Sequence, residues 1–260
     1  PEQVGLEKMY EFLIGEFKYV RDNIGESNAF GWANEAAARM ALAKLYLNKN
    51  AYLGTTGNDG FQDALTEVQA IIDGGKYALA ENYSDNFRED IEGNPEIIFA
   101  IPGDRTQTGM EAYGSTAAGY NGSCGIPQWI YTYAPEDQRL ADTWAYGQQH
   151  YGVENADGTW TPNAGDPIPF TADDWAGKGY LNYSIKCHSI DNPGCFQQEG
   201  ARLHKYEIVG GTNDGTTAND VVIFRYADVL FIKAECLLRL GQDEQTAADL
   251  ITEVRKRSFS

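Results

Sequence analysis

Aromatic side chains set among polar residues and glycines are the most distinctive chemical feature of this 260-residue sequence. Tyr, Phe and Trp make up 12% of the chain, and many of them stand beside Gly, Asn, Asp or Ser rather than in apolar periodic segments. Rings in such surroundings lie near solvent, where they offer flat surfaces to a ligand. The candidates are Trp129, Tyr131, Tyr133, Trp144, Tyr146, Trp160 and Trp175.

Each of these rings also has a plainer interpretation. Trp129, Tyr131 and Tyr133 would share one side of the chain if their segment is extended, because alternate side chains of an extended chain point the same way. For Trp129 and Trp144 the alternative to ligand contact is a place in the core of a subdomain. For Trp160 and Trp175 the alternative is a solvent-facing loop position.

Catalytic and metal-binding patterns are missing from the sequence. Adjacent carboxylates such as Asp173-Asp174 and Glu89-Asp90 are best interpreted as solvated charge in a chain with 38 acidic residues. The three histidines have no metal-ligand spacing, and neither a GxSxG motif nor a phosphate-binding glycine loop occurs. We therefore predict no catalytic residue, no metal site and no cofactor.

Two local features each allow two interpretations. Residues 155–159 carry the oxygen ligands and the turn of a calcium loop but lack its closing Glu, which favours an ordinary Asx-Gly turn. Cys187 and Cys195 could close a surface loop in an oxidising compartment, or remain thiols. Cys236 lies in an apolar helical segment and is predicted to be core.

The charge balance excludes several classes of partner. Thirty-eight acidic residues against 20 basic ones give a formal charge of −18, which repels the phosphates of a nucleic acid. No run of about 18 apolar residues occurs, so no membrane-spanning segment is predicted. The chain starts at Pro1 without a charged and apolar leader, and we expect any targeting segment to have been removed or to lie outside it.

Apolar residues spaced three and four apart predict helices at both ends of the chain. The first covers residues 6–24 and ends at Gly25, an Ala-rich one covers 34–48, and a third follows the turn at 57–60 and ends at Gly74. The pattern returns at 225–240 and again beyond Gly241. Two such pairs of helices resemble tetratricopeptide-type hairpins. We predict a mainly α fold in which these hairpins form a scaffold.

The middle of the chain is long, irregular and rich in Gly, Asn, Pro and Trp. Short strands are predicted at 96–101 and 221–224, one on each side of it. We divide the chain into the first part of a helical scaffold (1–102), a loop-rich excursion with the candidate ligand site (103–217) and a final helical hairpin (218–260). Long ordered loops in compact domains are usually functional.

Several segments, in order, resemble successive landmarks of the SusD/RagB family. They are AAARMALAKLYL (36–47), GGKYAL (74–79), NPEIIFA (94–100), DQRL (137–140), KY (205–206), FRYADVL (224–230) and VRKR (254–257). Cys236 and Thr252-Glu253 depart from the pattern, and the early N-terminal helices and the segment after VRKR are absent, as in an incomplete member. At the helix start, Arg225 and Asp228 are three apart, a spacing at which the two side chains can pair, and we predict a mainly structural role for this segment.

The resemblance implies a lipid-anchored protein on the cell-surface face of the bacterial outer membrane, with the N-terminal anchor outside this chain. Such a protein is not an enzyme. It captures oligosaccharides or polysaccharides and passes them to a TonB-dependent transporter of the SusC type. Sugars present apolar C–H faces flanked by hydroxyls, so stacking rings and polar side chains of the excursion would hold them. Peptide capture, or a tetratricopeptide-type protein-binding scaffold without sugar binding, are the alternatives.

Overall fold

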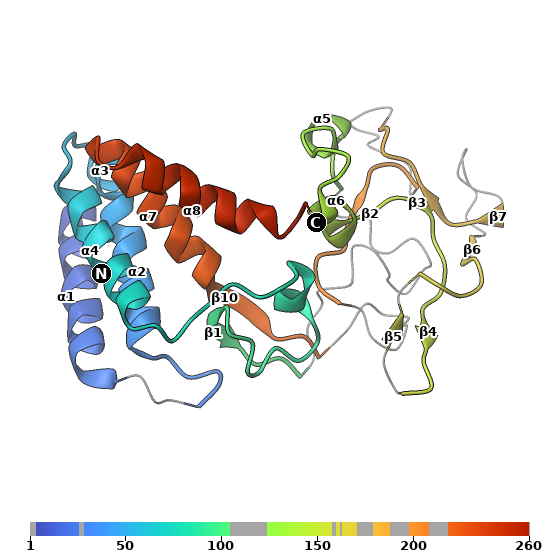
Figure 1. Cartoon of the computed structure of the whole chain (residues 1–260), viewed down its shortest axis with the longest axis horizontal. Helices are drawn as coiled ribbons and strands as arrows, with labels where there is room; N and C mark the ends of the chain where they lie inside the picture. Colours follow the sequence, from blue (N-terminus) through green and yellow to red (C-terminus); the bar gives the residue numbers. More distant parts are fainter. Residues whose placement is uncertain are drawn as a thin grey trace.

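The computed structural model describes residues 4–25, 29–104, 124–157, 160–161, 163–170, 179–187, 198–207 and 218–259 (Figure 1). The helices of the two chain ends are α1 (Leu6–Ile24), α2 (Glu35–Leu47), α3 (Lys49–Leu53), α4 (Asp59–Asp73), α7 (Tyr226–Leu240) and α8 (Glu244–Lys256). A 3₁₀ turn, η1 (Ser84–Phe87), precedes the first strand. The predicted mainly α fold is confirmed.

Local signals set most of the helix boundaries. Asn34 caps α2, because its side-chain oxygen accepts a hydrogen bond from the backbone N–H of Ala37 at 2.9 Å. Gly241 ends α7 in the left-handed conformation, with φ of 65°. The helix α4 begins at Asp59, inside the turn that was predicted to precede it, and the short α3 was not predicted.

The hairpins α2–α4 and α7–α8 stack on each other through α4 and α7. Met40, Val68, Val229 and Cys236 are fully buried in the core that they share. Small residues such as Ala43 and Ala64 lie in the same core and allow close approach of the helices. Figure 1 shows these helices side by side at one end of the molecule, with α1 beyond α2. The predicted helical scaffold and the core position of Cys236 are therefore confirmed.

Two strands link the helical scaffold to the excursion. As predicted, strands form at β1 (Ile97–Ile101) and β10 (Val221–Arg225), and they pair antiparallel with Ile101 opposite Val221. The register shifts around Phe99. Since β1 ends where the excursion begins and β10 starts where it finishes, the chain leaves the scaffold and returns to it at one place.

The described part of the excursion is built from very short elements. They are α5 (Pro127–Ile130), α6 (Gln138–Thr143), β2 (Trp144–Ala145), β3 (Gly147–Gln148), β4 (Val153–Glu154), β5 (Trp160–Thr161), β6 (Pro169–Phe170), β7 (Gly179–Tyr180), β8 (Asn182–Tyr183) and β9 (Arg202–Leu203). The antiparallel pairs are β2–β9, β3–β8, β4–β5 and β6–β7. The division of the chain into scaffold and excursion at residues 102 and 217 stays a prediction.

The excursion is attached to the scaffold by backbone hydrogen bonds. Gln138, at the start of α6, donates to the carbonyl of Ser258 at 3.0 Å, just beyond α8. Glu207 donates to the carbonyl of Phe87 in η1 at 2.8 Å. These bonds fix the orientation of the excursion on the end of the helical stack.

The pairing of Arg225 with Asp228 that their spacing allows does not form. Asp228 pairs with Lys44 at 2.5 Å, and Arg225 pairs with Glu96 at 2.7 Å. Arg225 has extended backbone angles and belongs to β10, so it does not take part in the first turn of α7. Spacing rules for helical side-chain pairs require both residues to be helical.

Candidate functional site

A pocket of about 370 Å³ opens in the excursion between α6, β2 and the residue that follows β9. Its walls include Trp144 and Tyr146, two of the rings predicted from the sequence. Its remaining polar lining consists of Gln149, Asn163 and His204. None of the described residues that line it is charged.

Helix capping and strand pairing position the two rings. The Asp137 carboxylate accepts the backbone N–H of Arg139 and caps α6, whose C-terminal cap residue is Trp144. Trp144 then pairs with Leu203 in the β2–β9 ladder. The backbone N–H of His204 donates to the carbonyl of Thr143 at 2.7 Å. The ladder therefore brings His204, 60 positions further on, beside Trp144.

Trp144 lines the pocket and also packs in the subdomain. A methyl group added to Gly125 would lie 2.9 Å from ring atom Cζ3 of Trp144 and 2.9 Å from Cδ1 of Ile130. The indole N–H of Trp144 donates weakly to the hydroxyl of Tyr133 at 3.4 Å. One part of the ring is thus fixed by packing while the half-buried remainder lines the pocket. Trp144 therefore combines the two roles that the sequence allows, a place in the core of the subdomain and a wall of the candidate ligand pocket.

Backbone contacts hold the polar side chains of the pocket. Gln149 is buried, and its amide nitrogen donates to the carbonyls of Tyr146 and Gly147 at 3.2 and 2.9 Å. Asn163 has a left-handed backbone, with φ of 56°, and its side-chain oxygen accepts the backbone N–H of His150. Asn is one of the residues that tolerates this conformation.

His204 supplies a neutral ring to the pocket. Burial lowers the pKa of His204, so the imidazole is uncharged at neutral pH. A neutral imidazole carries one donor nitrogen and one acceptor nitrogen. Together with the side chains of Gln149 and Asn163, it suits a ligand whose hydroxyls both donate and accept.

Other predicted rings lie elsewhere. Trp129 is in α5 and Tyr131 follows it, with 56% and 66% of their surfaces exposed, and neither lines the pocket. The segment is a helical turn rather than an extended strand, because Pro127 starts a helix at this point. Trp129, Tyr131 and Tyr133 therefore do not share one side in the way an extended segment would require. The side chain of Trp160 and all of Trp175 lie outside the described residues.

Sequence reasoning did not identify Gln149, Asn163 and His204 as pocket residues, because each is polar and stands in an irregular segment. The β2–β9 and β3–β8 pairings position His204 and Gln149. The hydrogen bond from the backbone of His150 positions Asn163. The predictions for the Cys187–Cys195 loop and for the turn at 155–159 can be followed only in part, because Cys195 and residues 158–159 lie outside the described residues. The sulfur of Cys187 lies near that of Cys124, and both lie against Gly200.

Neither a metal cluster nor a membrane span is found in the part of the chain that the structure describes. No group of three or more His, Cys, Asp or Glu side chains there could hold a metal ion. Within the same ranges, no helix combines the length and the apolar character needed to cross a membrane.

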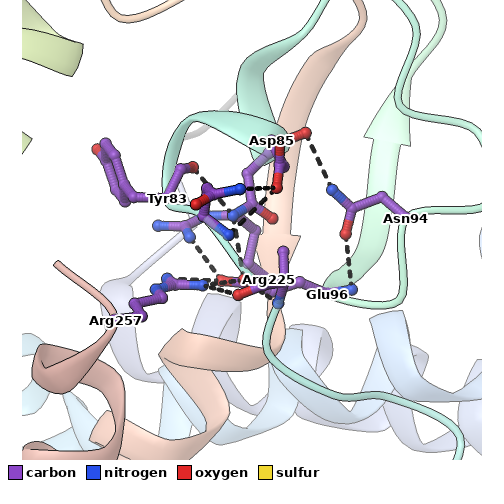
Figure 2. A network of polar contacts seen from close by, with 9 residues as sticks. Tyr83, Asp85, Asn94, Glu96, Arg225 and Arg257 are labelled. Carbon is purple, nitrogen blue, oxygen red and sulfur yellow. Dashed lines mark hydrogen bonds and ion pairs between the residues drawn. The ribbon is translucent and has the colours of Figure 1, made fainter. Parts of the chain in front are cut away.

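A buried ion network joins three of the sequence landmarks (Figure 2). The Glu96 carboxylate, fully buried, pairs with Arg225 at 2.7 Å and with both terminal nitrogens of Arg257. It also accepts hydrogen bonds from the backbone of Ala80 at 2.9 Å and from the side chain of Asn86 at 3.0 Å. Burial by itself raises the pKa of Glu96, but the hydrogen bond from Arg257 and the charges of both arginines outweigh it and hold this pKa below its usual value.

The same network fixes the segment before β1. Asn94 accepts the backbone N–H of Glu96 at 2.9 Å and donates to the carbonyl of Asp85 at 3.0 Å (Figure 2). The ring of Tyr83 lies 5.8 Å from the guanidinium carbon of Arg225, within the range of a cation–π contact. The segments 94–100, 224–230 and 254–257 therefore meet at one buried carboxylate.

Residues 95–260 match the SusD family, which is more than half of the chain. The chain belongs to the SusD family. The match starts just before Glu96 and includes both arginines of the ion network, so all three charged residues of this network lie inside the SusD region. The first two helical hairpin elements, α2 and α4, precede it.

Two SusD-like relatives cover different lengths of the chain. The SusD-like protein P38 of Formosa agariphila is 25% identical over 233 residues, which are 84% of this chain and 41% of that protein. A SusD-like protein of Bacteroides ovatus is 28% identical over 97 residues, which are 36% of this chain and 18% of that protein. The chain thus spans less than half the length of these relatives.

Solved structures share the fold. A SusD superfamily protein from Parabacteroides distasonis has a TM-score of 0.65 at 16% identity, over 94% of this chain and 49% of its own. Surface glycan-binding protein A from Bacteroides thetaiotaomicron, in complex with laminarihexaose, has a TM-score of 0.65 at 19% identity, over 99% of this chain and 55% of its own. At these identities the likeness establishes the SusD fold.

Proposed function

We propose that this protein captures oligosaccharides or polysaccharides at the cell surface, with the pocket of Trp144 and Tyr146 as part of the binding site. The observation that carries the proposal is the composition of that pocket: two aromatic walls, three polar side chains and no charged residue in its described lining. A ligand that fits must be neutral, hydroxylated and partly apolar, which are the properties of a neutral sugar.

The lining of the pocket complements the two kinds of surface that a sugar presents. The C–H faces of a pyranose ring are apolar and stack on Trp or Tyr rings, while the hydroxyls at its edge need donors and acceptors. Side-chain amides and a neutral imidazole supply both without the desolvation cost of a charge. Gln149 and Asn163 are held by backbone contacts, so little side-chain entropy is lost when a sugar binds.

The relatives support the same ligand class. A surface glycan-binding protein with this fold was solved with laminarihexaose, a neutral oligosaccharide. Extending that property to this chain is part of the proposal. The proposal further includes a lipid anchor in the outer membrane, transfer of the glycan to a SusC-like TonB-dependent transporter, and binding without catalysis.

The experiment measures glycan affinity by isothermal titration calorimetry on the full-length protein, with a panel of neutral oligosaccharides that includes laminarihexaose. Tyr146 is the position to change, because the residue is 37% exposed and its side chain forms no hydrogen bond or ring contact with the described part of the chain. We expect Tyr146→Ala to weaken binding about 3- to 10-fold, the loss of one stacking contact. The matched control is Tyr19→Ala, which removes a 68% exposed ring from α1.

Trp129→Ala separates the pocket from the exposed rings around α5. If Trp129→Ala abolishes binding and Tyr146→Ala does not, the glycan binds at α5 and the proposed pocket is wrong. If no member of the panel binds and the protein instead takes up peptides, or retains a transporter without any sugar, glycan capture is refuted in favour of the peptide-binding or protein-scaffold alternative.

A further inference from the structure

A second pocket, of about 270 Å³, lies at the junction of η1, β10 and the start of α7. It shares no lining residue with the first pocket. Its walls include the rings of Phe87 and Phe231 and the side chain of Ile223, and its polar groups include Lys205, Tyr206 and Arg225. Phe231 and Ile223 are 42% and 40% exposed, so the pocket opens to the surface.

Two cations face the same aromatic ring in this pocket. The Lys205 ammonium lies 4.2 Å from the centre of the Phe87 ring, and the guanidinium carbon of Arg225 lies 5.2 Å from it. Burial and the charge of Arg225 lower the pKa of Lys205 to about 8. Keeping a lysine half-buried beside an arginine is costly unless something compensates the charge.

No carboxylate compensates Lys205 among the residues that the structure describes, although the chain has 38 acidic residues. Asp228, the acidic residue that lines the pocket, pairs with Lys44 at 2.5 Å. Glu96 pairs with Arg225 through Nη1 at 2.7 Å. The positive charge of Lys205 thus stays uncompensated inside a strongly acidic protein.

Arg225, which also lines this pocket, has hydrogen-bond donors that the described part of the chain does not use. Its Nη1 is used by Glu96, while Nε and Nη2 form no hydrogen bond with the described part of the chain. These two N–H groups form a planar fork that matches the two oxygens of a carboxylate. The hydroxyl of Tyr206, which accepts the backbone N–H of Val222 at 3.3 Å, still has a proton to donate.

We propose that this pocket binds the carboxylate of a small organic acid, with the Arg225 fork and the Lys205 ammonium on the two oxygens and the rings of Phe87 and Phe231 against the body of the ligand. The volume is below the roughly 300–1,000 Å³ of drug-sized ligand pockets, so one small acidic unit fills it. An acidic sugar and the C-terminus of a peptide share this chemistry. The inference is independent of the proposed function, which concerns another pocket and a neutral ligand.

Lys205 is the position that tests the inference. Arg225 is unsuitable, because its replacement would leave the buried Glu96 with one cation fewer and unfold the scaffold. Lys205→Met keeps the apolar contact with Phe87 and removes the charge. The matched control is Lys186→Met, which removes an exposed lysine of the excursion that lines neither pocket.

Calorimetric titration of the full-length protein compares three probes: D-glucuronate, D-glucose and N-acetylglycine. We expect glucuronate, N-acetylglycine or both to bind with saturation and glucose to bind at least about 10-fold more weakly. Lys205→Met should weaken binding of the acid at least about 10-fold, and Lys186→Met should leave it unchanged. The preferred acid identifies the source of the carboxylate.

Three results would overturn the inference. They are a failure of both acids to bind the full-length protein, equal binding of glucuronate and glucose, and unchanged binding in a folded Lys205→Met variant. Circular dichroism and a thermal melt establish that the variant is folded. Loss of acid binding in both lysine variants would also overturn it, because the attraction would then come from overall charge rather than from this pocket.

Discussion

Glu96 and Arg257 are 161 positions apart in the sequence, and the carboxylate of the first accepts hydrogen bonds from both terminal guanidinium nitrogens of the second. Glu96 stands immediately before β1, and Arg257 immediately after α8. Their contact therefore ties the strand that begins the excursion to the last helix of the scaffold, with Arg225 of β10 as the third member.

Replacing Glu96 by Gln should strongly destabilise the protein. The variant leaves two guanidinium groups beside a neutral amide in a buried site, and breaking a buried ion pair from one side costs about 3–5 kcal/mol. Urea unfolding followed by circular dichroism measures the loss. Glu235→Gln, which breaks an exposed pair with Arg239, should cost under about 1 kcal/mol. Equal losses in the two variants would show that the buried network contributes no special stability.

The stability that Glu96 contributes should depend on pH in a defined direction. Its pKa in the folded protein lies below the usual carboxyl value of 4.5, so the unfolded chain binds the proton more readily. The contribution is complete above about pH 4.5 and is lost as the pH falls through the folded-state pKa. The difference in Tm between the wild type and Glu96→Gln should thus be wide at pH 7 and narrow progressively in acid. A difference that is constant with pH would contradict this assignment.

Gly200→Ala should destabilise the excursion through a steric clash. Gly200 has φ of 79°, and a methyl group there would lie 2.6 Å from Cβ of Cys124 and 2.5 Å from its sulfur. Gly147 has the same φ, but an added methyl group meets nothing within 4 Å. Gly147→Ala should therefore cost only the backbone strain, about 1 kcal/mol, and Gly200→Ala clearly more. Thermal melts compare them, and the prediction fails if the two losses are equal.

Gly125→Ala should disturb the first pocket by displacing Trp144, although Gly125 itself does not line the pocket. The new methyl group would lie 2.9 Å from both Trp144 and Ile130, so the indole ring must move. We expect the affinity for a neutral oligosaccharide that binds the wild type to fall about 3-fold or more, with a change in tryptophan emission. Gly54→Ala serves as the control, because Gly54 lies in the scaffold, also has a positive φ, and an added methyl group there meets nothing within 4 Å. An unchanged affinity despite a displaced ring would mean that Trp144 acts only in packing.

The sequence predicted the scaffold well because its signals are local. The three- and four-residue spacing in α1, the cap at Asn34 and the stop at Gly241 act within a few positions of each helix end. The two strands β1 and β10 were also predicted, although their pairing is a long-range property.

Predictions failed where a partner distant in the sequence decides the outcome. Arg225 and Asp228 satisfy a helical spacing, yet each pairs with a residue of another element, Glu96 and Lys44. An extended conformation was considered for residues 129–133, but the structure has a helical turn that begins at Pro127. The polar lining of the first pocket could not be predicted, since two-residue strands carry no periodic signal.

The pairing of Ile101 with Val221 has an evolutionary consequence. Neighbouring strands are about 5 Å apart, so the chain leaves the scaffold for the excursion and returns from it within one narrow seam. Insertions, deletions and exchanges between the two sides of that seam need not change the spacing of the helices. A lineage can therefore replace the loops of the excursion and inherit the helical stack unaltered.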